Sequence, residues 1–530
     1  MHYLKNNKRT GWLWIIIIIL LSSCTKGFKD MNTNPNALPG DRLNWDNVYL
    51  GGFFKQMGEN VIPLGINDYQ VVQNLAGDIF GGYNGQTHNW NAAGDNTTYN
   101  FSIGWNGAAY NIFYSRIIKN YDTISKYSAN NPDIIAVARI IKVAAAHRMV
   151  DMYGPVPYFK TQGSLGSGAV YDPMDSIYFS FFKDIDSATT TLKKYISLGV
   201  NTLKNFDPIY RGNYRQWVQF ANALKLRLAM RIVYAEPEKA RGYAEAAVSD
   251  PAFLITTKGD NATLQGTEGV TYTNPLWGVT DAYQEARMSA NMESFLMGYA
   301  DPRLPAYFQP SKIAGDPSGV YRGIRSGSII ADGLRYQPFS MLQYNYNLVW
   351  MSAAEVSFLR AEGALRGWNM GGTAQQFYEA GITASFDQWG VSGAAAYIAN
   401  STNKPRAYTD PVNGTNNVAA GDPILSTITI KWDEAGSFEK NLEQVITQKW
   451  IAMYPNGQEA WSEFRRTGYP KIFPIKSNKG NDPRLNTIQV KRLPYPASEY
   501  QNNNINVIRG VTLLGGTDLG GTKLWWDKKP

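Results

Sequence analysis

Apolar residues recur every three or four positions along several stretches of the chain, which is the period of a helix with one buried face. The clearest stripe runs from Ile134 to Met152 and ends at Gly154-Pro155. A second stripe, from Ile177 to Ile196, completes a pair near 134–196. The same pattern predicts three further pairs, near 216–249, 350–388 and 440–467. The sequence therefore predicts a mostly α fold that contains four helix hairpins.

Turn residues separate the two helices of the later pairs. Pro237 suits a first helical turn, Gly371-Gly372 interrupts the third pair, and Pro455-Asn456-Gly457 interrupts the fourth. Bulky residues face small ones, which favours a stacked, tetratricopeptide-like scaffold, and the uneven spacing excludes a strict repeat. Four tryptophans in these stretches are assigned to the core: Trp350, Trp368, Trp450 and Trp461.

Long segments between the pairs show little periodicity. Residues 256–346 and 401–430 are rich in Gly, Asn, Thr, Tyr and Pro, and residues 80–105 have the same character. Long loops on a rigid scaffold are where binding sites are usually built. We therefore expect one domain over residues 41–530, with its ligand site on these insertions.

The N-terminus has the pattern of an export signal. Lys5, Lys8 and Arg9 precede an apolar run of ten residues, Trp12–Leu21, and Leu21-Ser22-Ser23-Cys24 resembles a bacterial lipobox. We expect residues 1–23 to be removed and Cys24 to carry lipid. Residues 24–40, rich in Asn, Thr and Pro, would then form a tether. The run is too short to span a membrane as a helix, and no transmembrane helix is expected.

Composition narrows the chemistry further. The chain has 530 residues, of which 18% are charged and 13% aromatic, with one cysteine and three histidines. Disulfide frameworks, multi-cysteine zinc sites and most histidine-based catalysis are nearly excluded. The net charge of +8 falls to +5 without residues 1–23, and the basic residues are scattered. Nucleic acid is therefore not an expected partner.

Common catalytic motifs do not occur in the sequence. There is no H-E-x-x-H, G-x-S-x-G, P-loop or G-x-G-x-x-G. A glycosidase needs only two suitably spaced carboxylates, so a hydrolase stays open as a weaker alternative. No cofactor is expected, although the loop from Asp410 to Asp422 could bind structural calcium through oxygen ligands without matching an EF-hand.

Two C-terminal segments closely resemble a known family. Residues 449–470 read KWIAMYPNGQEAWSEFRRTGYP and residues 492–503 read RLPYPASEYQNN. They are similar to the C-terminal signature of the SusD/RagB-like outer-membrane lipoproteins. Further matches follow in family order at MYGPVPY, WVQFANALKLRLAMRI, ADPRLPAYF and AEVSFLRAEGALRGW, which begin at residues 152, 217, 300 and 354.

The resemblance implies a binding protein without catalytic activity. Such a lipoprotein sits on a SusC-like TonB-dependent outer-membrane barrel, captures a glycan or a peptide at the cell surface, and closes over the transporter as a lid. One departure concerns the residues after Cys24, where relatives often carry an acidic run that marks export to the outer surface. Here the segment Thr25–Asp30 holds a single acid.

Candidate ligand-binding residues come from the loops. A sugar ring offers a C–H face and a rim of hydroxyls, so its receptor needs exposed flat aromatics beside amides and carboxylates. Trp90 and Trp277 are the leading candidates, and each ring could instead pack under its own loop. The full set is Tyr83, Asn89, Trp90 and Asn91 in the first loop, Tyr272, Asn274, Trp277, Asp281 and Tyr283 in the second, and Arg335, Tyr344 and Tyr346 in the third.

Glycan capture for import is thus the leading function. Peptide capture by a protein of the same class is the main alternative, and it would use extended backbone contacts in a less aromatic cavity. A surface-tethered glycoside hydrolase is the third.

Overall fold

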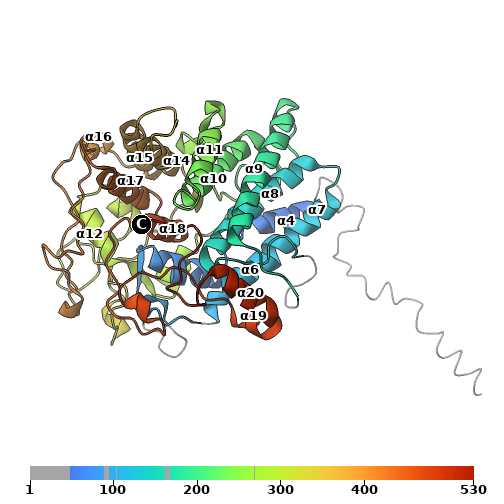
Figure 1. Ribbon diagram of the computed structural model, residues 1–530. Helices are drawn as coiled ribbons and strands as arrows, with labels where there is room; N and C mark the ends of the chain where they lie inside the picture. Colours follow the sequence, from blue (N-terminus) through green and yellow to red (C-terminus); the bar gives the residue numbers. More distant parts are fainter. Residues whose placement is uncertain (1–47, 89–94, 103, 162–167, 268) are drawn as a thin grey trace, which may run out of the picture. The chain divides into compact units, whose positions relative to one another are not determined.

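The computed structural model describes residues 48–88, 95–102, 104–161, 168–267 and 269–530. Its helices confirm the predicted mostly α, tetratricopeptide-like fold, since two lie within each of the four predicted stretches (Figure 1). They are α8 (Pro132–Tyr153) and α9 (Met174–Ser197), α10 (Tyr214–Arg231) and α11 (Pro237–Val248), α14 (Ala353–Leu365) and α15 (Ala374–Trp389), and α17 (Phe438–Ala452) and α18 (Gly457–Thr467).

Local sequence explains where these helices begin and end. Pro132 and Pro237 occupy first-turn positions of α8 and α11, where the missing N–H costs nothing. Thr373 caps α15, and Gln376 bonds back to it in a capping box. α15 and α18 end at Gly390 and Gly468, both in the left-handed conformation that glycine adopts without strain.

The third pair begins later than the sequence predicts. Trp350 lies in strand β4 (Val349–Met351), which pairs antiparallel with β2 (Ala262–Thr263). Ser352 then caps α14 by accepting a hydrogen bond from the Glu355 N–H at 3.2 Å. The helix ends at Leu365, so Trp368 lies beyond it and is only half-buried. Trp350, Trp450 and Trp461 are buried, as predicted.

The first three pairs pack as hairpins, α8 on α9, α10 on α11 and α14 on α15. The fourth differs, because α17 packs on α14 and α15 while α18 packs mainly on the π-helical segment η2 (Gln70–Asp78). Two glycines permit this contact. A Cβ on Gly77 would lie 2.6 Å from the Gln458 nitrogen, and one on Gly457 would lie 2.4 Å from the Asp78 Cα.

Several helices lie outside the predicted pairs. Most of them are short or adjoin π-helical turns, which interrupt the regular period that a sequence pattern can show. The α-helices are α4 (Val48–Gly58), α5 (Ile66–Tyr69), α6 (Ala108–Ile112), α7 (Lys119–Tyr127), α12 (Ala290–Gly298), α13 (Leu304–Tyr307), α16 (Ala394–Ile398), α19 (Ala497–Asn502) and α20 (Asn504–Leu514), and the further π-helical segments are η5 (Phe113–Ile118) and η8 (Gly278–Ala282).

Short elements complete the described chain. Strand β1 (Asn84–Gln86) pairs antiparallel with β3 (Ala286–Met288) and so joins the first loop region to the second. Single 3-10 turns are η3 (Asn96–Thr98), η4 (Trp105–Gly107), η6 (Pro251–Phe253), η7 (Lys258–Asp260), η9 (Gly333–Arg335), η10 (Gly414–Asn416) and η11 (Pro483–Asn486).

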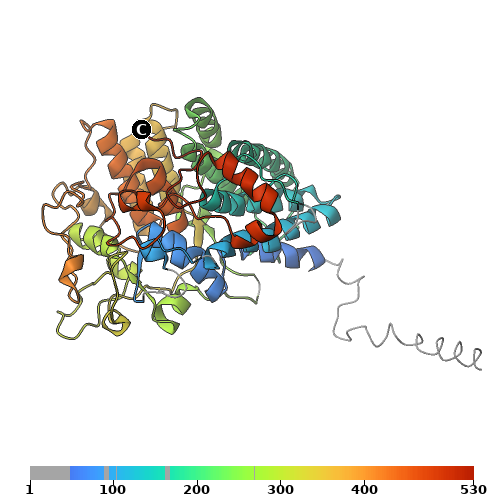
Figure 2. The same ribbon diagram turned by 60° about the horizontal axis from the view of Figure 1, so that its bottom comes forward.

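Residues 50–530 form one compact unit. Within it the first three helix pairs lie side by side in the upper part of both views, and the loop-rich insertions, yellow to orange, gather at the lower left (Figures 1 and 2). The predicted signal peptide, Cys24 and the tether lie outside the described residues.

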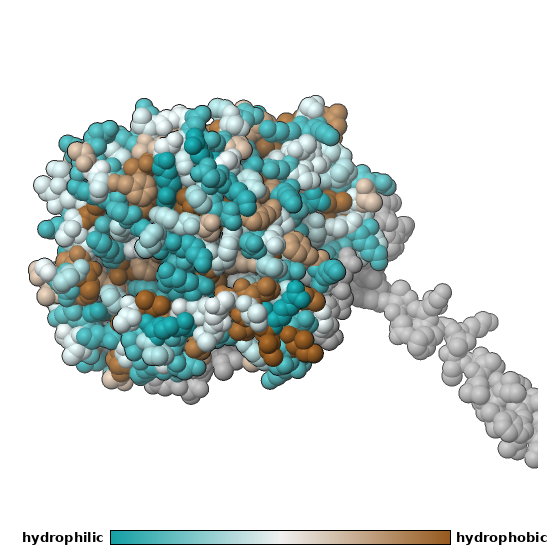
Figure 3. Space-filling view, in the orientation of Figure 1, coloured by the Kyte–Doolittle hydropathy of each residue, from teal (hydrophilic) through white to brown (hydrophobic). Residues whose placement is uncertain are grey.

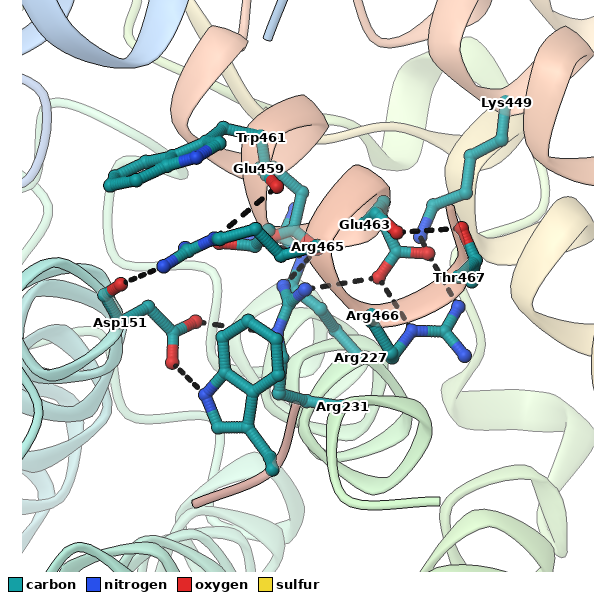
Figure 4. A network of polar contacts seen from close by, with 12 residues as sticks. Asp151, Arg227, Arg231, Lys449, Glu459, Trp461, Glu463, Arg465, Arg466 and Thr467 are labelled. Atoms are coloured by element: carbon teal, nitrogen blue, oxygen red, sulfur yellow. Dashed lines mark hydrogen bonds and ion pairs between the residues drawn. The ribbon is translucent and has the colours of Figure 1, made fainter. Parts of the chain in front are cut away.

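A buried network of ion pairs joins the helices of the predicted pairs to one another (Figure 4). Arg231 of α10 contacts Glu459 at 2.5 Å and Glu463 at 3.1 Å, both on α18, and Asp151 of α8 at 3.3 Å. Arg466 pairs with Glu463 at 2.6 Å and with Glu362 of α14 at the same distance. Each of these side chains is almost fully buried, so the network links all four predicted pairs through charge.

Candidate functional site

The predicted ligand residues do not all lie in one place. Asn89, Trp90 and Asn91 fall outside the described residues, so their role stays a prediction. Tyr83 is contradicted as a ligand residue because it is fully buried, where its hydroxyl donates to the Trp450 carbonyl and its ring packs 5.3 Å from the Trp450 ring. The polar sequence around Tyr83 predicts a loop. In the structure, Tyr83 directly precedes β1, and both are buried.

The second and third loops bring several predicted residues together around η8. Trp277 and Tyr283 flank this segment and remain 38% and 37% exposed. Asp281 lies between them and accepts a hydrogen bond from the Tyr344 hydroxyl at 3.0 Å. We call Trp277, Asp281, Tyr283 and Tyr344 the aromatic surface. It combines exposed rings with a carboxylate, the combination expected of a sugar receptor.

Elements near the N-terminal end of the described chain support this surface. The Tyr283 hydroxyl donates to Asn67 of α5 at 2.7 Å, and the Tyr272 hydroxyl donates to Glu59 at 2.6 Å. A Cβ on Gly278 would lie 2.2 Å from Ile66, so only glycine allows η8 to pack this closely on α5. These contacts hold the aromatic rings at fixed positions and reduce the entropy lost on binding.

Asn274 and Arg335 have different environments. Asn274 is buried, where its side chain donates to the Tyr346 carbonyl at 2.9 Å and accepts from the Leu276 N–H at 3.1 Å. It therefore shapes the loop. Arg335 is exposed in η9, and the neighbouring Gly333 closely approaches the Thr87 carbonyl. Arg335 thus lies on a turn beside the first loop, available to solvent.

Glu285 adds a titratable group next to the aromatic surface. It follows η8 by three residues and accepts a hydrogen bond from Gln70 of η2. Partial burial raises the pKa of its carboxyl to about 7, because the charged form loses hydration there. Glu285 is not among the predicted residues, since nothing in the local sequence pattern indicates its burial.

A cavity of about 300 Å³ is lined almost entirely by residues outside the predicted set and could not be foreseen from the sequence. Tyr346 is the one predicted residue that lines it. Its other walls come from residues 258–265, 347–355, 388–389 and 452–456, which are far apart in the sequence. Aromatic residues were visible in these segments, but their convergence depends on how α14, α15 and α17 pack.

In the loop that could bind calcium, the Asp410 carboxylate takes part in internal hydrogen bonds. Asp410 is buried and accepts hydrogen bonds from the Tyr336 hydroxyl at 3.1 Å and the Asn416 side chain at 2.7 Å. Within the described residues, no group of three or more His, Cys, Asp or Glu side chains could hold a metal ion.

Apolar side chains also gather on another surface, over α19 and α20 at the lower right of Figure 3. Ile505 and Ile508 of α20 are 83% and 53% exposed. None of the predicted ligand residues comes from these helices, so this surface is separate from the candidate site. No helix in the described part of the chain is both long enough and apolar enough to cross a membrane.

The protein is thus a scaffold of packed helix pairs. Its long insertions carry exposed aromatic residues that form the candidate site. The chain belongs to the SusD-like family, described as Susd and RagB outer membrane lipoprotein, which it matches over residues 30–527. The match covers nearly the whole chain and confirms the resemblance found in the sequence.

Solved structures of SusD homologues are similar over almost their full length. A chitin-binding SusD homologue from Flavobacterium johnsoniae shares 41% identity, with a TM-score of 0.85 over 90% of this chain and 98% of that one. Homologues from Bacteroides thetaiotaomicron and Bacteroides uniformis share 35% and 36% identity, with TM-scores of 0.83 and 0.82, and each match covers 91% of this chain and 99% of the other. Among curated proteins, none matches the sequence.

Proposed function

We propose that this protein is a glycan-binding lipoprotein of the outer membrane, anchored by lipid on Cys24 and facing the cell exterior. It captures oligosaccharide and delivers it, as a lid, to a SusC-like TonB-dependent barrel. It performs no chemical step and needs no cofactor. Family membership supports the class of protein, and the chitin-binding relative supports a glycan as the ligand.

The observation that carries the proposal is the aromatic surface. Trp277 and Tyr283 hold large exposed ring areas at positions fixed by α5 and η8, so binding a sugar there orders few additional groups. Asp281 and the Tyr344 hydroxyl supply the hydrogen-bonding partners that sugar hydroxyls require. Binding energy at this surface would bias the lid toward closure on the barrel.

The test is titration calorimetry on a soluble form that starts after Cys24, with chitotriose, maltotriose and trialanine as probes. We expect saturable binding of at least one oligosaccharide, weakened about tenfold or more in Trp277→Ala and Tyr283→Ala because each loses a stacking ring.

Tyr500→Ala provides a matched control. Tyr500 is also 37% exposed, and its hydroxyl donates to Asp518 at 2.7 Å, as that of Tyr283 does to Asn67. Equal loss of affinity in both tyrosine variants would contradict a specific role for the aromatic surface. Binding of trialanine without any oligosaccharide would overturn glycan capture in favour of peptide capture.

A further inference from the structure

Gln284 has a backbone conformation that glutamine rarely adopts. Its φ of 58° lies in the left-handed region, where a Cβ crowds the backbone and glycine is favoured. It directly follows Tyr283, the C-cap residue of η8. Three α-helices, α15, α18 and α20, end instead at a left-handed glycine: Gly390, Gly468 and Gly515. Because backbone strain of this kind concentrates at binding sites, it points to a role for the Gln284 side chain.

The Gln284 side chain bridges η8 and strand β3. Its Nε2 donates to the Asp281 carbonyl at 2.5 Å, and its Oε1 accepts from the Arg287 guanidinium at 2.6 Å. Arg287 is fully buried, and it also donates to the carbonyls of Thr280 and Gln337, both at 2.8 Å. The bridge therefore ties the turn after η8 to a side chain that the core holds in place.

The backbone of the same turn is fixed by the residue that follows β1. The Thr87 hydroxyl donates to the Gln284 carbonyl at 3.0 Å, and the Thr87 N–H donates to the Glu285 carbonyl at 2.9 Å. The Glu285 N–H in turn donates to the Val279 carbonyl at 3.1 Å. Since the first predicted loop follows Thr87 in the sequence, the turn joins the start of that loop to the end of η8.

This turn sets the positions of two members of the aromatic surface. Tyr283 is the residue before Gln284, and the Asp281 carbonyl accepts the Gln284 hydrogen bond. Tyr283 is exposed whereas Ala286, three positions later, is fully buried, so the chain passes from surface to core within the turn. A freer backbone here would let the ring and the carboxylate move relative to each other. Ordering them when a sugar binds would then cost affinity.

We propose that Gln284 is a positioning residue of the aromatic surface, whose left-handed backbone and bridge to Arg287 hold Tyr283 and Asp281 in the arrangement that binds sugar. The inference rests on the proposed function, because it concerns affinity for the same ligand. Gln284 acts through its neighbours rather than by touching the ligand. Its loss should therefore lower the affinity for every sugar that binds there without changing which sugar is preferred.

Gln284→Gly tests this role by calorimetry of the soluble form with chitotriose and maltotriose. Glycine accepts the left-handed backbone without strain but removes both side-chain hydrogen bonds. We expect both affinities to fall about fivefold or more, with their ratio unchanged. The melting temperature should stay within about 2 °C of wild type, because the relief of strain opposes the loss of the hydrogen bonds.

A conservative variant and a second measurement separate positioning from other effects. Gln284→Glu keeps the chain length and an acceptor for Arg287, so it should restore affinity to within about twofold of wild type. Hydrogen exchange without sugar should be faster at the amides of residues 278–287 in Gln284→Gly than in wild type, since the bridge that closes the turn is lost.

Ala300→Gly is the matched control. Ala300 also has a left-handed backbone, with φ 50°, and follows Tyr299, the C-cap residue of α12. It is exposed, and its methyl group cannot form a bridge. This variant should leave both affinities unchanged. Unchanged affinity in Gln284→Gly, or an equal loss in Ala300→Gly, would overturn the role of Gln284 and leave glycan capture intact. Absence of trisaccharide binding by the wild type would overturn both proposals.

Discussion

At the scale of single residues, Asp78 shows how burial sets a charge state. It is fully buried at the end of η2, where its carboxylate accepts hydrogen bonds from Gln73 at 2.7 Å and from the Gly457 N–H at 3.2 Å. Burial nevertheless dominates and raises the pKa of this carboxyl to about 7. Asp78 therefore holds its proton more tightly in the folded protein than in the unfolded chain.

This shift predicts a pH-dependent contribution to stability. A raised carboxyl pKa contributes stability that is complete below about pH 4 and is lost as the pH rises to about 7. The free energy of unfolding of the wild type, measured relative to that of Asp78→Asn, should therefore fall by about 3 kcal/mol from pH 5 to pH 8. Urea unfolding of both proteins at the two pH values measures this difference.

Asp316→Asn is the control for this experiment. Hydrogen bonds from Arg322 hold the pKa of the Asp316 carboxyl below its ordinary value, so this group is ionised at both pH 5 and pH 8 in folded and unfolded chains. The difference between wild type and Asp316→Asn should not change between these pH values. If the stability difference between wild type and Asp78→Asn were also the same at pH 5 and pH 8, the raised pKa of Asp78 would be contradicted.

At the scale of elements, charge rather than apolar contact alone positions α18. This helix packs on η2 instead of forming a simple hairpin with α17, and its Glu459 and Glu463 side chains reach Arg231 of α10. Removing one member of a buried network leaves its partners uncompensated in a medium that solvates them poorly.

Arg231→Met should therefore lower the free energy of unfolding by about 3–5 kcal/mol. Arg241→Met gives the matched comparison, since Arg241 forms an exposed pair with Glu245 at 3.0 Å on one face of α11. Its loss should cost less than about 1 kcal/mol. Guanidinium unfolding of the two variants measures both values, and similar costs would show that the buried network does not stabilise the packing of α10 and α18.

At the scale of the whole molecule, the described unit separates support from recognition. The helix pairs and their ion network form the support, while the aromatic surface comes from the insertions and is held in place by α5 (Figures 1 and 4). The proposed link to the membrane is Cys24, because the lipobox-like segment Leu21–Cys24 precedes a polar stretch that is predicted to form a tether. This arrangement predicts that membrane attachment and ligand binding can be changed separately.

Cys24→Ala tests that prediction in the full chain. Loss of the acyl chains removes about 0.8 kcal/mol of membrane affinity per buried CH₂, so the variant should move from the membrane fraction to the soluble fraction. The released variant should bind oligosaccharide with the affinity of the soluble form that starts after Cys24. Retention of Cys24→Ala in washed membranes would contradict a lipid anchor at this position.

Some structural features could be predicted from local sequence. The eight helices of the four pairs could be predicted because apolar residues recur in them every three or four positions, which is the period of a helix. Trp277, Asp281, Tyr283 and Tyr344 could be proposed because they occur in non-periodic insertions, where large aromatic residues lack a helical core to enter. The structure brings these four together around η8.

Other features depend on contacts between distant segments. Tyr83 stands in a polar loop sequence, yet its ring packs on Trp450, 367 positions away, and its hydroxyl donates to the Trp450 carbonyl. The cavity likewise needs the segments at 258–265, 346–355, 388–389 and 452–456 to converge. The sequence by itself thus determined the helix pairs, the family and the aromatic loop residues, since these follow from local periodicity and motif. Only the tertiary structure decided burial, the Asp78 and Glu285 pKa values and the cavity, because each depends on atoms that long-range packing brings together.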